Sequence, residues 1–148
     1  MSLGPLTMGY RANNTRTGFA ATRRLIYPKG AYVLHKIRMM MHDNRTGDQQ
    51  FKELMQDFRQ NHRGKAATRE DFKAMVEKHM TREMDLEGKR KMDWFFAEYV
   101  YGTRLPRYSL DSWFDIGADR DVIFRMKLTQ SDVDAKFRML GAHLSCNG

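Results

Sequence analysis

The sequence predicts a mainly α-helical fold in which a four-helix subdomain is followed by a short β hairpin. In four segments that precede Pro106, large apolar residues recur every three or four positions, which is the spacing of one helix face. After Tyr108 apolar and polar residues alternate, which is the period of a strand. We therefore divide the chain into an extended or looped leading segment (1–24), a helical part (25–106) and a hairpin (107–148).

The composition indicates one folded and basic domain. The chain has 148 residues, of which 41% are hydrophobic and 30% charged, so it is polar but long enough to bury a core. Its net charge of +8 arises within residues 1–106, which hold 20 basic and 12 acidic residues. An excess of positive charge suits an anionic partner. The basic residues are spread over several segments, however, and match no helix-turn-helix, RNA-recognition or zinc-finger pattern, so we expect no specific nucleic-acid binding.

The sequence also excludes two kinds of structural feature. It has no run of about 18 apolar residues, so we expect no membrane-spanning helix. Its single cysteine, Cys146, excludes an internal disulfide and a cysteine-based zinc cluster.

The first helix is expected to begin at Tyr27-Pro28, because proline suits the first helical position, where its missing N–H would have no partner. It is expected to end at Asn44–Gly47. Its inner positions recur at helical spacing: Ala31, Leu34, Ile37 and Met41.

The second helix is expected to begin near Asp48 and to end within 61–64. Its apolar stripe is formed by Phe51, Leu54, Met55 and Phe58.

The third helix is expected to begin at Thr68, where Asp71 three residues later completes a capping box. Its inner face is formed by Phe72, Met75, Val76 and His79. The fourth helix is expected over about 89–101 and ends at Gly102. Its inner residues are Met92, Phe95, Phe96, Tyr99 and Val100.

Two alternating segments, 108–114 and 122–128, predict the hairpin, with a turn at 117–120 between them. Residues 135–140 are expected to begin a third strand.

The histidines do not predict a metal site. There are five of them, His35, His42, His62, His79 and His143, and none forms an HExxH motif. His35 and His42 are seven residues apart and could share a helix face, but they lack the third ligand that zinc needs. We therefore expect this chain alone to bind no zinc.

The segment from Tyr27 to Gly30 is unusual for a purely structural helix. A glycine inside a helix costs about 1 kcal/mol relative to alanine, which suggests that another group approaches the backbone at Gly30. The residues alone fit either a core tyrosine beside a packed glycine, which they favour, or a functional tyrosine. They also leave open whether Lys29 pairs with an acid or stays solvated.

An ordered set of motifs resembles the aminopeptidase N family of zinc peptidases, the gluzincins, over about residues 25–107. The set begins with Tyr27-x-Lys29-Gly30-Ala31 followed by Val33-Leu34, Phe51 and Phe58, and continues with Ala67-Thr68-x-x-Asp71-Phe72, Asp93-Trp94-Phe95-Phe96, Tyr99-Val100-Tyr101-Gly102-Thr103 and Pro106. The resemblance implies the C-terminal helical part of a thermolysin-like catalytic domain, followed by the start of a β-sandwich.

The resemblance also implies a function. The family binds one zinc through HExxH and a downstream glutamate, none of which lies in this chain, so zinc would belong to the full-length parent and the chain alone would be inactive. The family's catalytic tyrosine corresponds to Tyr27, which would donate a hydrogen bond to the oxyanion formed during peptide hydrolysis. Many members have glutamate where this chain has Pro28. The parent would remove N-terminal residues from peptides.

Two partner expectations follow from the same resemblance. The helices would pack against the missing N-terminal half of the peptidase domain, so the chain alone should expose apolar surface or self-associate.

The alternative function is a non-catalytic, basic α-helical interaction module, with nucleic acid as one candidate partner.

Overall fold

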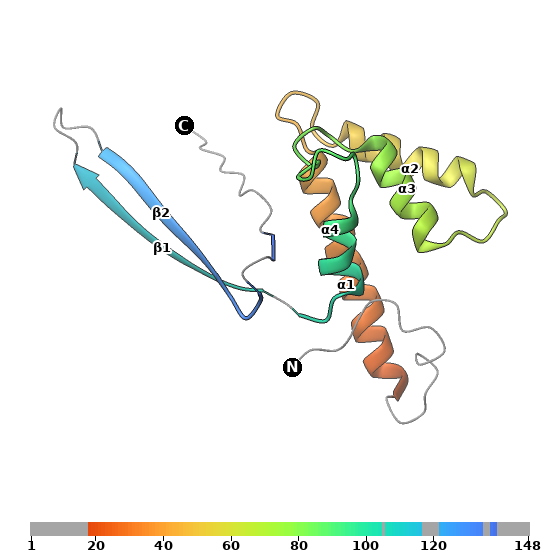
Figure 1. The fold of residues 1–148 in the computed structure, drawn as a ribbon, viewed down its shortest axis with the longest axis horizontal. Coiled ribbons are helices and arrows are strands. Elements are labelled where there is room, and N and C mark those ends of the chain that lie inside the picture. Colours follow the sequence, from red (N-terminus) through yellow and green to blue (C-terminus); the bar gives the residue numbers. More distant parts are fainter. Residues whose placement is uncertain (1–17, 105, 117–121, 135–136, 139–148) are drawn as a thin grey trace. The chain divides into compact units, whose positions relative to one another are not determined.

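The computed structural model describes residues 18–104, 106–116, 122–134 and 137–138 (Figure 1). Expectations for residues 1–17, for the hairpin turn, for most of the third strand and for Cys146 therefore lie outside the described residues. Within the described residues, four α-helices precede a two-stranded antiparallel hairpin, which confirms the mainly helical prediction. The chain divides between Thr103 and Arg104 into two compact units, and each is described by itself.

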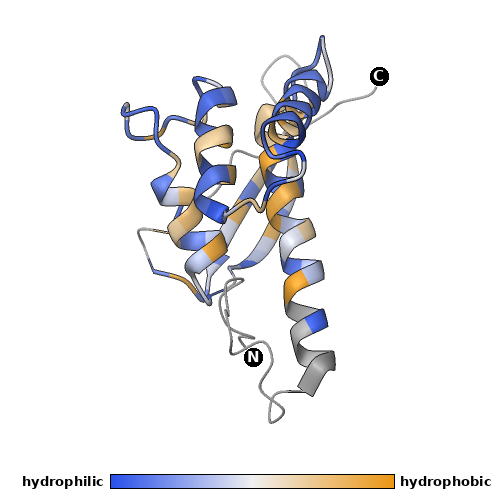
Figure 2. Ribbon diagram, turned by 90° about the vertical axis from the view of Figure 1, so that its right-hand side faces the viewer, coloured by the Kyte–Doolittle hydropathy of each residue, from blue (hydrophilic) through white to orange (hydrophobic). Residues whose placement is uncertain are grey.

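Helix α1 (Gly18–Met41) begins nine residues earlier than the sequence predicts. Pro28 therefore lies inside the helix rather than at its first turn, and residues 18–24 are helical rather than looped. Five of the six residues from Ala20 to Leu25, all except Thr22, are good helix formers, so the helix extends past a position where one backbone hydrogen bond is missing. Hydrophobic and hydrophilic residues alternate in bands along α1 (Figure 2). Its buried residues are Val33, Ile37 and Met41, whereas Ala31, expected to face inward, is exposed.

Helices α2 (Gln49–Asn61) and α3 (Arg69–His79) agree with the predicted segments. A tight turn joins α1 to α2, and Gly47 adopts the left-handed φ of 62° that this turn requires. Phe58 of α2 meets Phe72 of α3 edge to face, with ring centroids 5.2 Å apart. The Gln50 side chain of α2 donates a 2.7 Å hydrogen bond to the His79 carbonyl at the end of α3.

The fourth helical segment differs from its prediction at the start. Helix α4 (Asp93–Phe95) begins four residues later than expected, because Arg90 adopts a left-handed φ of 52° and the Asp85 carboxylate accepts the Arg90 N–H. The segment continues as the π-helix η2 (Phe96–Tyr101), which Gly102 caps as predicted. All five predicted inner residues are buried: Met92, Phe95, Phe96, Tyr99 and Val100.

The second unit contains strands β1 (Arg107–Ile116) and β2 (Val122–Ser131), paired antiparallel. The register places most of the apolar residues on one face, where Phe114 packs against Phe124 with centroids 4.9 Å apart, while Trp113 and Ile123 lie on the other face. On the other face Arg125 pairs with Asp115. The apolar face is open to solvent within the described residues, since Phe114 is 70% exposed. A lone hairpin is only marginally stable, so this face is compatible with the expected self-association, which stays a prediction.

Among the described residues, no helix combines the length and apolarity that crossing a membrane requires.

The cap of α3 gives a first prediction. The Asp71 N–H donates to the Thr68 hydroxyl, and the Asp71 carboxylate accepts the Thr68 N–H at 2.8 Å, so the predicted capping box is formed. Thr68→Ala should lower the free energy of unfolding by about 1 kcal/mol, measured by urea denaturation. Thr68→Ser, which keeps the hydroxyl, should stay close to the wild type. An alanine variant as stable as the wild type would show that the cap contributes nothing.

Candidate functional site

Tyr27 lies in the interior of α1, as its tenth residue, and not at the helix start where the sequence predicts it. Its side chain is 69% exposed, so it is not a tyrosine of this chain's own core. The Arg23 guanidinium lies over its ring, 6.0 Å from the centroid. Within the described part of the chain, the Tyr27 hydroxyl has no hydrogen-bond partner. The phenol is therefore presented at the surface with its donor available.

Tyr27 is exposed because it lies in the part of α1 that precedes the first buried residue, Val33, among those with described side chains. Successive helical residues are rotated by about 100°, so residues four apart lie on nearly the same face. Tyr27, Ala31 and His35 are spaced in this way, and all three are exposed. The buried residues Val33 and Ile37 lie on another face of the helix. Leu34 and Met41, seven and fourteen residues after Tyr27 on nearly the same face, are half-buried and buried. Tyr27 is therefore exposed because the core contacts only the later part of α1.

Lys29 is not merely solvated, because it binds a backbone carbonyl of another helical segment. Its ammonium donates a 2.7 Å hydrogen bond to the carbonyl of Gly102, 73 residues away, at the end of η2. Burial lowers the pKa of the Lys29 ammonium. A methyl group added at Gly102 would lie 2.2 Å from the Glu98 carbonyl oxygen, so only glycine fits there.

Lys36 makes a second contact between α1 and η2. Its ammonium lies 4.7 Å from the ring centroid of Tyr32 and 4.6 Å from that of Tyr99. Lys29 and Lys36 are seven residues apart, which is about two helical turns, so they share one side of α1. Two residues rotate a helix by about 200°, so Tyr27 points away from the side that carries Lys29.

Three of the five histidines, His42, His62 and His79, contact neighbouring side chains. His42 bonds to the Asp48 carboxylate at 2.9 Å, and His79 bonds to Asp57 at 2.9 Å. His62 stacks on Phe58 with centroids 4.6 Å apart, and His35 is exposed. His143 lies outside the described residues. No group of three potential metal ligands occurs among the residues that the structure places.

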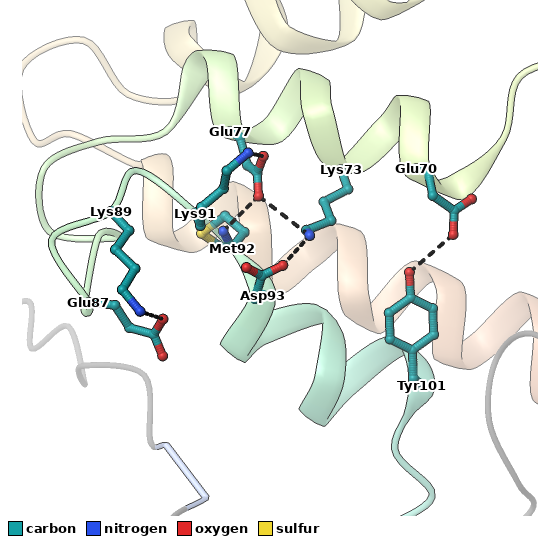
Figure 3. A network of polar contacts seen from close by, with 9 residues as sticks. All are labelled: Glu70, Lys73, Glu77, Glu87, Lys89, Lys91, Met92, Asp93 and Tyr101. Atoms are coloured by element: carbon teal, nitrogen blue, oxygen red, sulfur yellow. Dashed lines mark hydrogen bonds and ion pairs between the residues drawn. The ribbon is translucent and has the colours of Figure 1, made fainter.

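A network of charged side chains fixes the start of α4 against α3 (Figure 3). The Glu77 carboxylate accepts hydrogen bonds from the Met92 N–H and from Lys91, both at 3.0 Å. Lys73 pairs with Glu77 at 3.6 Å and also with Asp93. Burial alone would raise the pKa of Glu77, but its hydrogen bonds outweigh burial and the pKa is lowered. These carboxylates are ionised and paired, so they act in packing rather than in acid–base chemistry.

A shallow hollow of about 650 Å³ lies at the end of α2 and in the loop that follows. Its apolar residues include Met55 and Phe58, and its cations are Arg59, Arg63 and Lys65. None of these three cations has an ion-pair partner within the described residues. The hollow therefore joins apolar surface to unpaired positive charge.

The residues that sequence reasoning missed are Gly102 as an acceptor and Lys36 as a contact to Tyr99. The seven-residue spacing of Lys29 and Lys36 signals a shared face, but it does not identify what that face meets. That partner becomes visible only when the fold brings η2 beside α1.

The chain matches no protein-family model, no curated protein and no solved structure.

The Asp48 carboxylate gives a prediction for acid stability. Two hydrogen bonds lower the pKa of Asp48 from 3.8 to about 2. The bond from Arg38 has the larger effect and the bond with His42 the smaller one. Because the folded pKa is depressed, the contribution is complete above about pH 4 and is lost as pH falls toward 2. Asp48→Asn should therefore be less stable than the wild type at pH 6, with a difference that shrinks toward pH 2.

Urea midpoints at pH 6, 4, 3 and 2.5 measure this difference. Glu83→Gln is the matched control, because Glu83 is exposed and has no partner within the described residues. A difference between Asp48→Asn and the wild type that stays constant with pH would contradict the assignment.

Proposed function

We propose that this chain is the C-terminal helical part of the catalytic domain of a zinc aminopeptidase, and that Tyr27 is its catalytic residue. The observation that supports the proposal is the presentation of Tyr27. It is an exposed phenol within Tyr27-Pro28-Lys29-Gly30, in the part of α1 that precedes the first buried residue, Val33. The sequence resemblance to the aminopeptidase N family supplies the reaction, and the exposed hydroxyl is compatible with it.

The chemistry asked of Tyr27 is hydrogen-bond donation. When a nucleophile attacks the carbonyl carbon of a peptide bond, the carbonyl oxygen becomes an anion. A phenol is protonated at neutral pH and donates one O–H without itself carrying charge. A donor of this kind contributes about 10²–10³ in rate when it is aimed at the oxyanion.

The described residues contain no group of three potential ligands, so the proposal assigns the zinc ligands to another part of the full-length protein. The surface that this other part would cover includes three exposed residues of α1, Tyr27, Ala31 and His35.

The experiment uses the full-length protein and aminoacyl p-nitroanilides as substrates. We expect hydrolysis that a chelator abolishes and zinc restores. Tyr27→Phe should lower kcat by about 10²–10³ with little change in KM, because the lost hydrogen bond forms mainly in the transition state.

The control for this variant is Tyr32→Phe, which removes a second tyrosine hydroxyl from α1 and should leave kcat within about twofold, as expected for a surface change. An unchanged kcat in Tyr27→Phe would end the catalytic assignment.

A second candidate function rests on the hollow at the end of α2. Three unpaired cations beside apolar residues are the features that bind nucleic-acid phosphates and bases. If the chain is a basic interaction module, it should bind a single-stranded oligonucleotide at 50 mM salt and lose affinity steeply by 300 mM. Fluorescence anisotropy measures this binding.

The double variant Arg59→Gln/Arg63→Gln should then bind more weakly than Lys52→Gln/Arg82→Gln, which removes the same charge elsewhere. Equal losses in both would indicate binding without a defined site, and no binding at 50 mM salt would remove this candidate.

A further inference from the structure

Two residues close to Tyr27, Pro28 and Gly30, weaken the helical backbone of α1 at that point. Pro28 has no N–H and cannot form the backbone hydrogen bond that its position would otherwise make. Gly30 has the second-lowest helix propensity after proline. Tyr27 is therefore followed, within three residues, by the two residues that stabilise a helix least.

No residue of α1 from 26 to 32 is buried in the core, so core packing does not stabilise this stretch. Counted from the N-terminus, the first buried residue of α1 among those with described side chains is Val33. Ile26, Tyr27 and Pro28 are all exposed. The turn that carries Tyr27 thus extends at least one helical turn beyond the packed part of α1.

Lys29 lies between the two weak residues and contacts η2 across 73 residues of sequence. Its partner, the Gly102 carbonyl, is at the C-terminal end of η2, where carbonyls lack intrahelical donors and the helix dipole favours a cation. The close approach of Gly102 to the Glu98 carbonyl leaves no space for a side chain, which restricts the position of this acceptor.

We infer that Lys29 is a positioning residue for Tyr27, which it serves by anchoring the weak Pro28–Gly30 stretch of α1 to the Gly102 carbonyl. The inference rests on the proposed function, because it concerns the aim of the Tyr27 hydroxyl. Tyr27 and Lys29 project from opposite sides of α1, so Lys29 touches no substrate and acts only through the position of the helix. Small displacements of a catalytic group reduce turnover strongly, by up to about 10² for 1 Å.

The test is a double-mutant cycle in the full-length protein, with kcat and KM measured on an aminoacyl p-nitroanilide. Lys29→Met should lower kcat by roughly 10-fold to 100-fold and leave KM within about twofold. Lys29→Arg, which keeps a cationic donor, should recover most of the loss. In a Tyr27→Phe background, Lys29→Met should lower kcat by no more than about twofold, because the group that it positions is already gone.

The matched control is Lys36→Met, which removes the other lysine that joins α1 to η2. Lys36 lies beyond Val33, within the packed part of the helix, so its loss should lower the melting temperature without a comparable loss of kcat. Melting curves of every variant verify folding, and Lys29→Gln replaces Lys29→Met if the latter does not fold.

The outcomes separate the two claims. If Tyr27→Phe lowers kcat but Lys29→Met and Lys29→Gln do not, the positioning role is overturned and the proposed function stands. An equal loss from Lys29→Met in the wild-type and Tyr27→Phe backgrounds also overturns it, because Lys29 would then act on stability alone. If Tyr27→Phe itself has no effect, both claims fall together.

Discussion

The aromatic segment formed by α4 and η2 is the constraint on which the helical unit depends. Phe95 is fully buried and contacts the rings of Trp94, Phe96 and Tyr99, with centroids 5.0 to 5.9 Å away. The Trp94 indole N–H also donates to the Met84 carbonyl at 3.3 Å. Burial of large aromatic rings is strongly favourable, since each removes a large apolar area from water. The segment therefore fixes where its neighbours lie.

The two lysines of α1 transmit that constraint to the long helix. Lys29 and Lys36 both bind the η2 segment, through a carbonyl and an aromatic ring, and they set which side of α1 faces inward. Tyr27 precedes Val33, the first buried residue of α1 among those with described side chains, and it therefore stays exposed. The charged network around Glu77 plays the same role for α3 and the start of α4. In this account an exposed phenol is a consequence of how the core is arranged, and it does not require a dedicated local structure.

Local patterns in the sequence were sufficient to predict the helices, the hairpin and the capping box at Thr68, because each depends on residues that are close in sequence. The start of α1 was predicted wrongly, because Pro28 is typical of a helix N-terminus and nothing local shows that the helix continues before it. The late start of α4 depends on Asp85 binding the backbone of Arg90, and the π-helical turns have no sequence period of their own. The Lys29–Gly102 contact spans 73 residues, so only the fold reveals it. For the candidate site, the sequence identified Tyr27, and the structure added its exposure and the anchor beside it.

The central claim is that the Tyr27 hydroxyl meets the oxyanion of a peptide undergoing hydrolysis. The most direct measurement is a crystal structure of the full-length protein with zinc and a phosphinic peptide, whose tetrahedral oxygens imitate that oxyanion. The account predicts a hydrogen bond of roughly 2.5–3.0 Å from the Tyr27 oxygen to a phosphinyl oxygen, with the exposed part of α1 around Tyr27 covered by the zinc-bearing part of the protein. A phosphinic peptide bound elsewhere, with the Tyr27 hydroxyl still in solvent, would contradict it.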